Sequence, residues 1–311
     1  MAQQQPKIVV LGGINMDLVT YSPRFPQPGE TVVGSSFITY AGGKGANQAV
    51  AVARMGADSK MVGRVGGDMF GPQLLEGMTA AGVDVSGVGT NQEVSSGIAV
   101  IGVDDTAQNC ITQVLGANDT CGPAEAQAVK NALSGASFLL LQLEVSIQLS
   151  LEVARAAKAQ GVEVMLDPGP VRPVPDESFA LCDVITPNET EAQALVGFPV
   201  TDEESAAQAA SQLLERGVGL VVVKLGAQGA YYANSEERGM VRPFDIEAVD
   251  SVAAGDAFNG ALAVSLAEGA ALERAVTFAS AAGALAVTQS GAQDSMPRRA
   301  QVEAFVRDQR P

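Results

Sequence analysis

The stretch KIVVLGGIN, residues 7–15, is a short run of β-branched and Leu residues that ends near two glycines. Such a continuous apolar run is typical of a strand that is buried on both faces of a sheet. Four more runs of this kind follow along the chain, namely FLLLQLE (138–144), EVMLDP (163–168), DVITPN (183–188) and LVVVKLG (220–226). Ala-rich helical patterns lie between them, for example over 147–160 and 204–216, and each of these two ends at a glycine.

This alternation of strands and helices predicts an α/β fold, a three-layer αβα arrangement with a mainly parallel sheet. Two regions depart from it, because residues 16–41 and 97–116 contain successive strand patterns with no helix between them. We interpret them as a small inserted β-sheet lid, with a turn at 104–107, on a single domain spanning 1–311. Ligands of such sheets bind at the carboxyl ends of the parallel strands.

Histidine is absent from the 311 residues. The sequence therefore excludes a Ser-His-Asp triad, a His-bound zinc and a phosphohistidine relay. Any general base must be Asp, Glu, Lys, Tyr or Cys. Three widely spaced cysteines argue against a disulfide framework and against CxxC metal sites.

The net charge of −16 argues against nucleic-acid binding, which requires clustered Lys and Arg. No apolar run approaches the roughly 20 residues that span a bilayer, so no membrane association is expected. The start MAQQQPKIVV carries one Lys and no long apolar stretch. We therefore expect no signal peptide and a cytoplasmic protein.

The stretch DSVAAGDAFNG (250–260) places one carboxylate, Asp256, where small residues lead into a helical pattern. Small residues at 253–255 allow the backbone to approach a ligand closely, and the first N–H groups of a helix bind anions. Asp256 could accept a hydroxyl proton there while these donors neutralise a transferring phosphoryl group. An ordinary acidic residue in a first helical turn would give the same pattern.

Three further stretches carry polar groups at predicted strand or loop ends. AGGKGAN (41–47) opens a helix and offers Lys and Asn donors for sugar hydroxyls, although a tight strand-to-helix turn would look the same. TPNETEA (186–192) suits either a hydrated Mg²⁺ or ordinary helix capping. KLGAQG (224–229) suits either a nucleotide or a simple hairpin turn. The two common nucleotide loops, GxxxxGK[ST] and GxGxxG, are both absent.

Taken together and in this order, these motifs resemble the ribokinase-like (phosphofructokinase-B) family of sugar kinases. The resemblance runs from GGINMD through GGKGANQAVA, LQLE, TPNETEA, KLGAQG and VAAGDAFNGAL to GAQDSMP, nearly the whole chain. GGKGANQAVA favours the ribokinase branch. The resemblance implies ATP-dependent phosphorylation of D-ribose at O5.

The resemblance also implies a role for individual residues. Asp256 would be the general base, and the backbone of Ala253, Ala254 and Gly255 the anion hole. The residues implied in sugar binding are Asn15, Met16, Asp17, Gly43, Lys44, Gly45, Asn47, Glu144 and Asp256. Those implied at the nucleotide are Asn188, Lys224, Leu225, Gly226, Ala227, Gln228, Gly229, Gly255, Ser280 and Gly283. Glu191 would serve Mg²⁺ through water.

A monovalent cation, K⁺, is implied beside the anion hole. The matching positions are Asp250, Val252, Ala286, Gln289, Gly291 and Ser295. A cation there would strengthen the field of the helix terminus. The sequence departs from the family pattern at DPGP (167–170), where Asn-Pro-Ala-Pro is more usual, at Ser280, where relatives often carry a larger side chain, and at Ala257, commonly Thr.

Family habit and the lid's strand edges favour a homodimer formed lid to lid. Other acceptors stay open: deoxyribose, a nucleoside or a ketohexose. The low aromatic content of 5% favours a free sugar over a nucleoside. A catalytically silent sugar- or nucleotide-binding regulator would need neither Asp256 nor Glu191. A dehydrogenase is disfavoured by the missing dinucleotide fingerprint.

Overall fold

The computed structural model describes residues 5–106 and 108–309. Within them, the main sheet contains β1 (Lys7–Leu11), β4 (Asp58–Gly66), β5 (Asp84–Asn91), β8 (Phe138–Leu141), β9 (Glu163–Leu166), β10 (Val184–Ile185), β11 (Leu220–Lys224), β12 (Ala230–Ala233) and β13 (Arg238–Val241). The strand order is β13-β12-β11-β10-β9-β8-β1-β4-β5. The strands from β11 to β5 pair in parallel, and β12 and β13 add an antiparallel edge.

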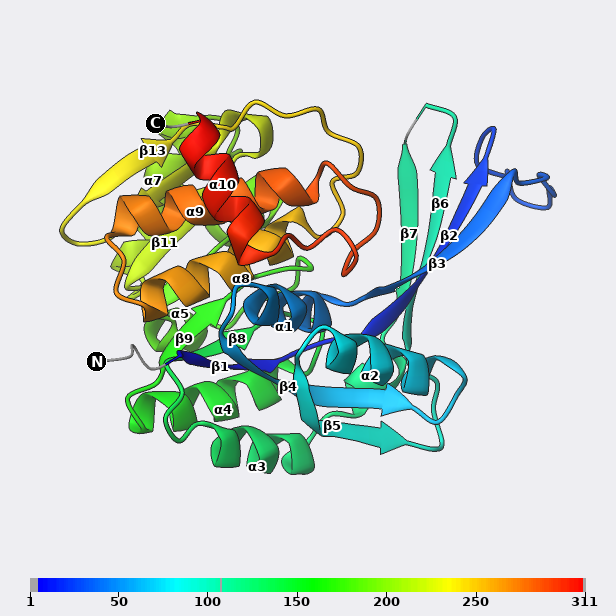
Figure 1. Ribbon diagram of the computed structural model, residues 1–311, viewed down its shortest axis with the longest axis horizontal. Helices are drawn as coiled ribbons and strands as arrows, with labels where there is room; N and C mark the ends of the chain where they lie inside the picture. The colour runs from blue at the N-terminus through cyan, green and yellow to red at the C-terminus, as the bar shows by residue number, and fades with distance from the viewer. Residues whose placement is uncertain (1–4, 107, 310–311) are drawn as a thin grey trace.

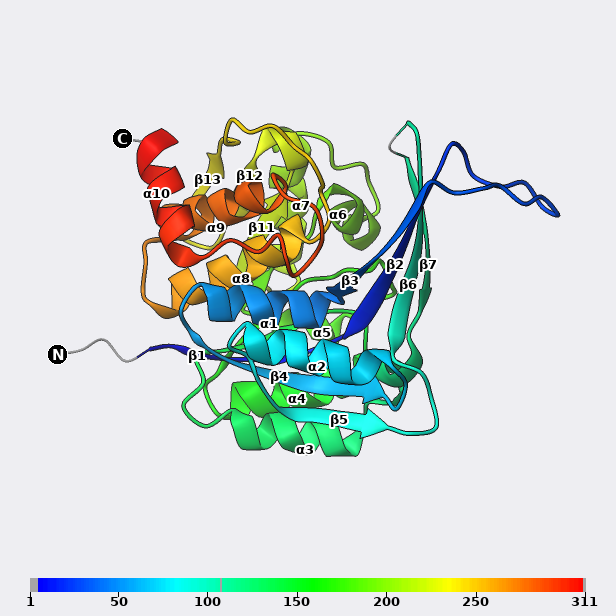
Figure 2. The ribbon, with the colours of Figure 1, turned by 45° about the vertical axis from the view of Figure 1, so that its right-hand side comes forward.

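Helices cover both faces of this sheet (Figures 1 and 2). One face packs against α1 (Lys44–Arg54), α2 (Phe70–Ala80), α8 (Ala254–Ala267), α9 (Leu272–Ala286) and α10 (Arg299–Gln309). The other packs against α3 (Pro123–Ala132), α4 (Ile147–Ala159), α5 (Glu177–Leu181), α6 (Glu189–Val196) and α7 (Glu203–Glu215). Alternate residues of β1 serve the two layers, since Ile8 and Val10 join the first core and Val9 and Leu11 the second.

A second sheet stands apart from the main body, at the right of Figure 1. It contains β2 (Asn15–Ser22), β3 (Ser36–Gly42), β6 (Gly97–Asp104) and β7 (Asn109–Val114) in the order β3-β2-β6-β7. We call these four strands the lid sheet. The predicted three-layer, mainly parallel αβα fold with a separate small sheet is confirmed. At the β6–β7 turn the Asp104 carboxylate accepts the N–H groups of Thr106 and Gln108, while position 107 lies outside the described residues.

The prediction of one strand over 7–15 is wrong. β1 ends at Leu11, two glycines lead the chain across, and Asn15 begins β2 in the lid sheet. The reason is the close packing of α1 on this crossing, because a Cβ on Gly45 would lie 2.7 Å from the Cα of Gly12. The other quoted runs also end earlier as strands than predicted, so that Glu144, Asp167 and Asn188 lie beyond the strand ends, whereas Lys224 is the last residue of β11.

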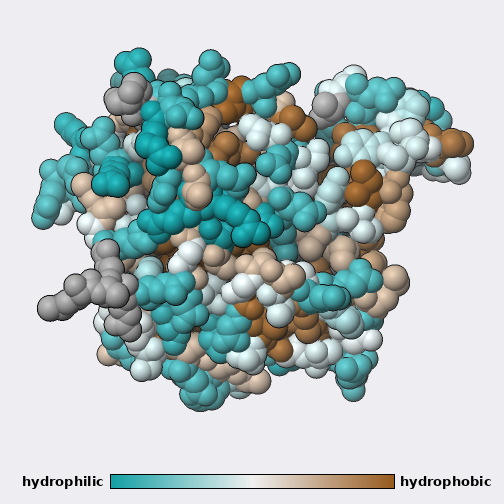
Figure 3. Space-filling model, in the orientation of Figure 1, coloured by the Kyte–Doolittle hydropathy of each residue, from teal (hydrophilic) through white to brown (hydrophobic). Residues whose placement is uncertain are grey.

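Apolar side chains are exposed on the lid sheet, where brown atoms appear at the right of Figure 3. They include Phe37 and Ile111, which are 61% and 58% exposed. Among the described residues, none of the helices combines the length and apolarity needed to cross a membrane.

Candidate active site

Glycines allow the start of α1 to pack closely against the end of β1. Gly43 precedes the helix with φ +90°, a conformation that favours glycine. The backbone N–H of Lys44, the first helical residue, donates to Glu144 Oε2 at 2.6 Å. Glu144 lies in the loop after β8, so an unpaired N–H at this helix start is satisfied by a carboxylate.

Glu144 is the centre of a buried polar cluster beside the lid sheet. Its Oε1 accepts hydrogen bonds from Asn15 Nδ2 at 3.0 Å and from Gln113 Nε2 at 2.6 Å. Asn118 Nδ2 donates to Asn15 Oδ1 at 2.8 Å, which fixes the orientation of the Asn15 amide. Asn15 and Glu144 were predicted from the sequence, whereas Gln113 and Asn118 carry no motif signal that would mark them.

Asp17 lies two residues after Asn15 in β2, on the same face of the strand, and its carboxylate packs against Gly42. Burial, together with the charges of Glu144 and Asp256, raises its pKa from 3.8 to about 7. The pKa of Glu144 is also raised by burial, against the opposing charge of Lys44. Met16 points the other way and packs in the main core, so its side chain brings no polar group to the site.

Asp256 lies in the first turn of α8 and is only 4% exposed. Asn47 Nδ2 donates to its Oδ2 at 2.9 Å, and Gln48 Nε2 donates to its Oδ1 at 3.0 Å. Both amides come from α1, which packs alongside α8. Burial raises the pKa of the Asp256 carboxyl, with Lys44 opposing this shift.

Ala253 caps α8 with φ +60° and ψ +6°. Among the described residues it is the one position other than glycine with a positive φ. A left-handed alanine costs about 1–2 kcal/mol, and such outliers gather at functional sites. The left-handed conformation of Ala253 turns the chain sharply into α8. The helix therefore starts at Ala254, next to Gly255 and Asp256.

A buried carboxylate that sequence analysis did not select, Asp167, joins two lysines. Its Oδ2 lies 2.8 Å from Lys44 Nζ, and its Oδ1 lies 3.8 Å from Lys224 Nζ. Gln48 Nε2 bridges Asp167 Oδ2 and Asp256 Oδ1, at 2.9 and 3.0 Å. Burial acts to raise the pKa of Asp167, but Lys224 and Lys44 hold it below its ordinary value. In the sequence, Asp167 is a carboxylate just after a buried strand. It stands in DPGP (167–170), which was noted only because the family motif is usually Asn-Pro-Ala-Pro.

The Lys44 ammonium therefore lies between two carboxylates. Besides its ion pair with Asp167, its Nζ is 3.9 Å from Asp256 Oδ1. Lys224, at the end of β11, reaches the anion-hole segment, since its Nζ is 3.2 Å from the position of a Cβ on Gly255. The two lysines thus supply positive charge on either side of Asp167.

Asn188 and Glu191 form a capping box at the start of α6. Asn188 N–H donates to Glu191 Oε2 at 2.9 Å, and Glu191 N–H donates to Asn188 Oδ1 at 2.8 Å. The capping interpretation of this stretch is therefore seen directly, while the other carboxylate oxygen, Glu191 Oε1, lies over Gly169 next to the Lys44 side chain. Asn188 also forms a parallel bridge with Lys224 in the sheet.

The predicted nucleotide positions gather near the same strand ends. Leu225 is buried, and Gly226 and Gly229 take positive φ around the short turn η2 (Gly226–Gln228), which includes Ala227. Gly283 of α9 packs on the first turn of α8, since a Cβ there would lie 3.2 Å from the Ala254 carbonyl oxygen. Ser280 Oγ, one turn earlier, is buried without a hydrogen-bond partner.

The predicted cation positions form two neighbouring loops beside Ala253. Asp250 Oδ1 accepts the N–H of Val252, and its Oδ2 accepts the N–H of Gly291, both at 3.0 Å. In the second loop Gln289 N–H donates to the Ala286 carbonyl, and Ser295 Oγ donates to the Ala292 carbonyl. The described residues contain no group of three or more His, Cys, Asp or Glu suited to a metal.

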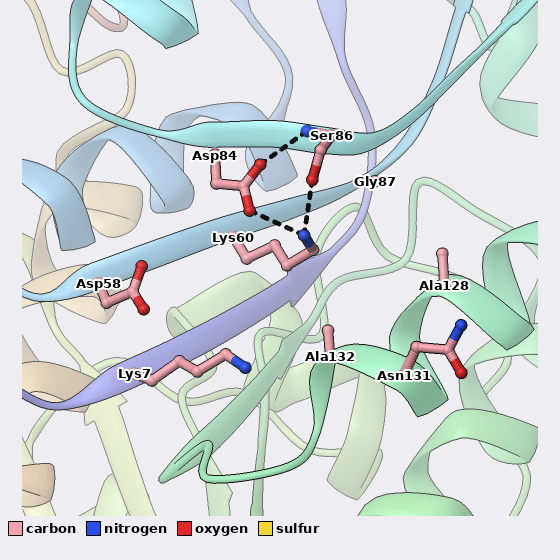
Figure 4. A pocket seen from close by; sticks show the side chains of 9 residues that line it. All are labelled: Lys7, Asp58, Lys60, Asp84, Ser86, Gly87, Ala128, Asn131 and Ala132. Carbon is pink, nitrogen blue, oxygen red and sulfur yellow. Dashed lines mark hydrogen bonds and ion pairs between the residues drawn. The ribbon is translucent and has the colours of Figure 1, made fainter.

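A separate cavity of about 390 Å³ lies far from these groups along the strands (Figure 4). It opens at the first residues of β1, β4 and β5, where Lys60 Nζ donates to Asp84 and Ser86 at 2.7 Å. Ligands of parallel sheets bind at the opposite, carboxyl edge. The candidate site is therefore the Glu144–Asp167–Asp256 region.

Known proteins match this fold and its motifs. The chain matches the model of the pfkB family carbohydrate kinases over residues 5–299. The chain belongs to the pfkB family of carbohydrate kinases. It is 37% identical to a ribokinase of Haemophilus influenzae, over 96% of this chain and 98% of the relative. A deoxyribokinase of Salmonella typhimurium is 34% identical, over 96% of this chain and 98% of the relative.

A solved structure of Arabidopsis thaliana ribokinase, complexed with ribose and ATP, superposes on the kinase with a TM-score of 0.90. It is 35% identical in sequence and covers 97% of this chain and 99% of its own. The family and the fold are thereby established. The substrate has to be inferred from the residues of this chain.

Proposed function

We propose that this kinase is an ATP-dependent ribokinase that phosphorylates D-ribose at O5 to ribose 5-phosphate. The observation that carries the proposal is the place of Asp256, which lies between the Glu144 cluster on one side and Lys224 with the α8 N-terminus on the other. A sugar hydroxyl bound by the Glu144 cluster would then lie next to Asp256. A phosphoryl group bound by Lys224 and the α8 N-terminus would approach the same carboxylate from the other side.

The lid side fits a molecule rich in hydroxyl groups. Asn15, Asp17 and Glu144 present carboxylate and amide oxygens in a buried setting, and hydroxyl donors pair with such acceptors. The low aromatic content of the chain, 5%, favours a free sugar over a nucleoside. The 37% identity to a ribokinase supports ribose as that sugar.

Asp256 would accept the proton of the 5-hydroxyl. Its two oxygens are held by Asn47 and Gln48, so the carboxylate has a fixed direction when the sugar arrives. Burial raises its pKa, which makes it a stronger base than a carboxylate in water. The orientation and the raised basicity both favour proton acceptance at this atom.

The phosphate side would stabilise the transferring group by charge. The α-helix α8 begins at Ala254, so the positive end of its dipole lies here, and Lys224 lies beside Gly255. Phosphoryl transfer depends chiefly on such positioning and charge neutralisation. ATP would lie along η2 and α9, with Asn188 near its phosphates.

The donor set at this side also fits a hydrated Mg²⁺. Asp167 Oδ1 is buried without a hydrogen-bond donor, and Glu191 Oε1 lies nearby over Gly169. Mg²⁺ typically uses one or two carboxylates plus waters and substrate phosphates. Glu191 would hold it through water, and the ion would neutralise charge on the phosphates.

K⁺ would bind between the Asp250 loop and the 286–295 loop. The Asp250 carboxylate holds the two loops together, which leaves backbone carbonyl oxygens as the main ligands. Such a cation would lie beside Ala253 and add to the positive field of the helix terminus.

A homodimer formed through the lid sheet completes the proposal. β3 and β7 are its edge strands, and Phe37 and Ile111 on them are exposed. Exposed apolar side chains on an unpaired sheet edge are typical of an interface. A monomeric mass in light scattering would contradict this part of the proposal.

The test is ADP release measured over a panel of pentoses, hexoses and nucleosides with Mg-ATP. The expected result is the highest kcat/KM for D-ribose, with ribose 5-phosphate as the product by NMR. A higher kcat/KM for 2-deoxy-D-ribose would support the second candidate, a deoxyribokinase, which the 34% identity to such an enzyme favours. No turnover of any sugar would refute the proposal.

A further inference from the structure

Strand β7 brings to the candidate sugar site a side chain that no motif marks. Gln113 Nε2 donates to Glu144 Oε1 at 2.6 Å, and the same oxygen accepts from Asn15 Nδ2 at 3.0 Å. Gln113 belongs to the lid sheet, whereas Glu144 follows β8 in the main sheet. The bond therefore joins the lid to the main body at the centre of the polar cluster.

The strand register places Gln113 in line with Asp17. Gln113 of β7 pairs with Ala99 of β6, and Ala99 pairs with Asp17 of β2. Paired residues of neighbouring strands direct their side chains to the same face. With about 4.8 Å between strands, the backbones at Asp17 and Gln113 are roughly 10 Å apart with only the methyl group of Ala99 between them. The side chains of Asp17 and Gln113 therefore face the same side of the lid sheet, one strand apart from each other across Ala99.

Of the donors to Glu144, Gln113 is the one free to change partner. The Lys44 N–H belongs to the backbone of α1, and Asn15 is fixed by its bond from Asn118. Gln113 is half-buried on an edge strand of the lid sheet. Its amide can both donate to and accept from a hydroxyl group.

We propose that Gln113 is a specificity-determining residue that binds one ring hydroxyl of the sugar from the lid side. In the sugar-free enzyme it donates to Glu144, and when the sugar binds its amide pairs with the hydroxyl that approaches Glu144. The proposal rests on the proposed function and adds the lid residue that recognises the acceptor. A site built to bind a hydroxyl discriminates against analogues that lack it.

The test compares Q113L with wild type on the sugar that the wild type phosphorylates best, which is D-ribose on our proposal, and on its 1-, 2- and 3-deoxy analogues. Q113L should lower kcat/KM for the parent sugar about 10-fold, mainly through KM, since one hydrogen bond is lost. For one deoxy analogue, the one that lacks the contacted hydroxyl, this penalty should disappear. KM for ATP should stay within about 2-fold, because Gln113 bonds to Glu144 on the proposed sugar side of the site.

T112V, on the exposed opposite face of the same strand, is the matched control and should match wild type on every sugar. Q113E is the second variant and should reduce sugar affinity more than Q113L, because it sets a second carboxylate against Glu144. An equal penalty for all four sugars, or wild-type kinetics in both Gln113 variants, would overturn the proposal. If wild type turned over no sugar in the panel, the proposed function would fail first, and this inference with it.

Discussion

The lid end and the phosphate end of the proposed site are built from different parts of the chain. At the lid end, side-chain carboxylates and amides from β2, β7 and the loop after β8 surround Glu144. At the phosphate end, the N-terminus of α8 and one lysine provide the positive potential. An array of hydroxyls requires donors and acceptors at defined points, whereas a phosphate needs only concentrated positive charge.

This difference also decides where the site responds to pH. At the lid end, burial together with the neighbouring carboxylates raises the pKa of Asp17. Backbone N–H groups carry no titratable proton. Asp256 stands where the two ends meet, so substitution there should have the largest effect.

Asp256→Asn should lower kcat about 10² to 10⁴-fold, the range for a lost general base, with KM for both substrates changed much less. Steady-state kinetics of ADP release measure this. Asp245→Asn, an exposed substitution of the same kind, is the control. Turnover near that of wild type would remove Asp256 from the reaction.

At the phosphate end, Ala253→Val should lower kcat/KM for ATP about 100-fold. A β-branched residue is an outlier at the observed φ of +60°, so the anion hole would deform. Ala253→Gly, which accepts this φ, should lose far less activity. Equal losses of kcat/KM in the two variants would show that activity does not depend on the left-handed conformation at position 253.

Asp167→Asn tests the connection between the two ends. Without the charge that holds it, Lys44 should move onto Asp256, 3.9 Å away, and lower the basicity of that carboxylate. We expect kcat to fall about 10-fold and its acid limb to shift to lower pH. An unchanged pH profile would contradict this role for Asp167.

At the lid end, ionisation of Asp17 should control sugar affinity. With a pKa of about 7, its carboxylate fraction rises about 10-fold between pH 6 and pH 8, and KM for ribose should fall accordingly. Asp17→Asn should show a higher KM that does not follow this titration. A wild-type KM that is flat across this range would argue against the role.

The same group should affect stability in the opposite direction. The raised pKa means that the folded state keeps a proton that the unfolded chain releases. This contribution is complete below about pH 4 and is lost as the pH rises through 7. Relative to Asp17→Asn, the wild type should therefore lose about 2 kcal/mol of unfolding free energy between pH 5 and pH 8, as measured by urea denaturation.

The smallest effect is expected from the cation beside the phosphate end. Replacing K⁺ by a large organic cation should lower kcat/KM for ATP about 2- to 5-fold, since one charge near a helix terminus contributes about 0.3–1 kcal/mol. Asp250→Asn should remove most of the response to K⁺. Equal activity with and without every alkali cation would contradict the site.

Much of the fold could be predicted from local patterns. FLLL at 138–141 and LVVV at 220–223 are buried strands because a parallel sheet covered on both faces accepts only apolar runs. Strand ends were predicted less well. The run 7–15 splits at Gly12 because α1 packs directly on the crossing, a contact between residues far apart in the sequence.

Most of the site residues that were selected from the sequence stand in motifs, but a motif does not say which of its residues meet the site. Asn47 was selected from GGKGANQAVA, whereas Gln48 in the same motif was not, although it binds Asp256 equally well. Gln113 lies in an ordinary alternating strand, and only the register of the lid sheet brings it to Glu144.

The sequence by itself determined the αβα fold class, the absence of histidine chemistry and the small residues before Asp256, because these follow from local composition and periodicity. Only the tertiary structure decided which distant groups meet. Asp167 between Lys44 and Lys224, and Gln113 on Glu144, depend on how strands and helices far apart in the chain pack together. Long-range packing fixes the distances between charges, and those distances set both the pKa values and the direction of each hydrogen bond.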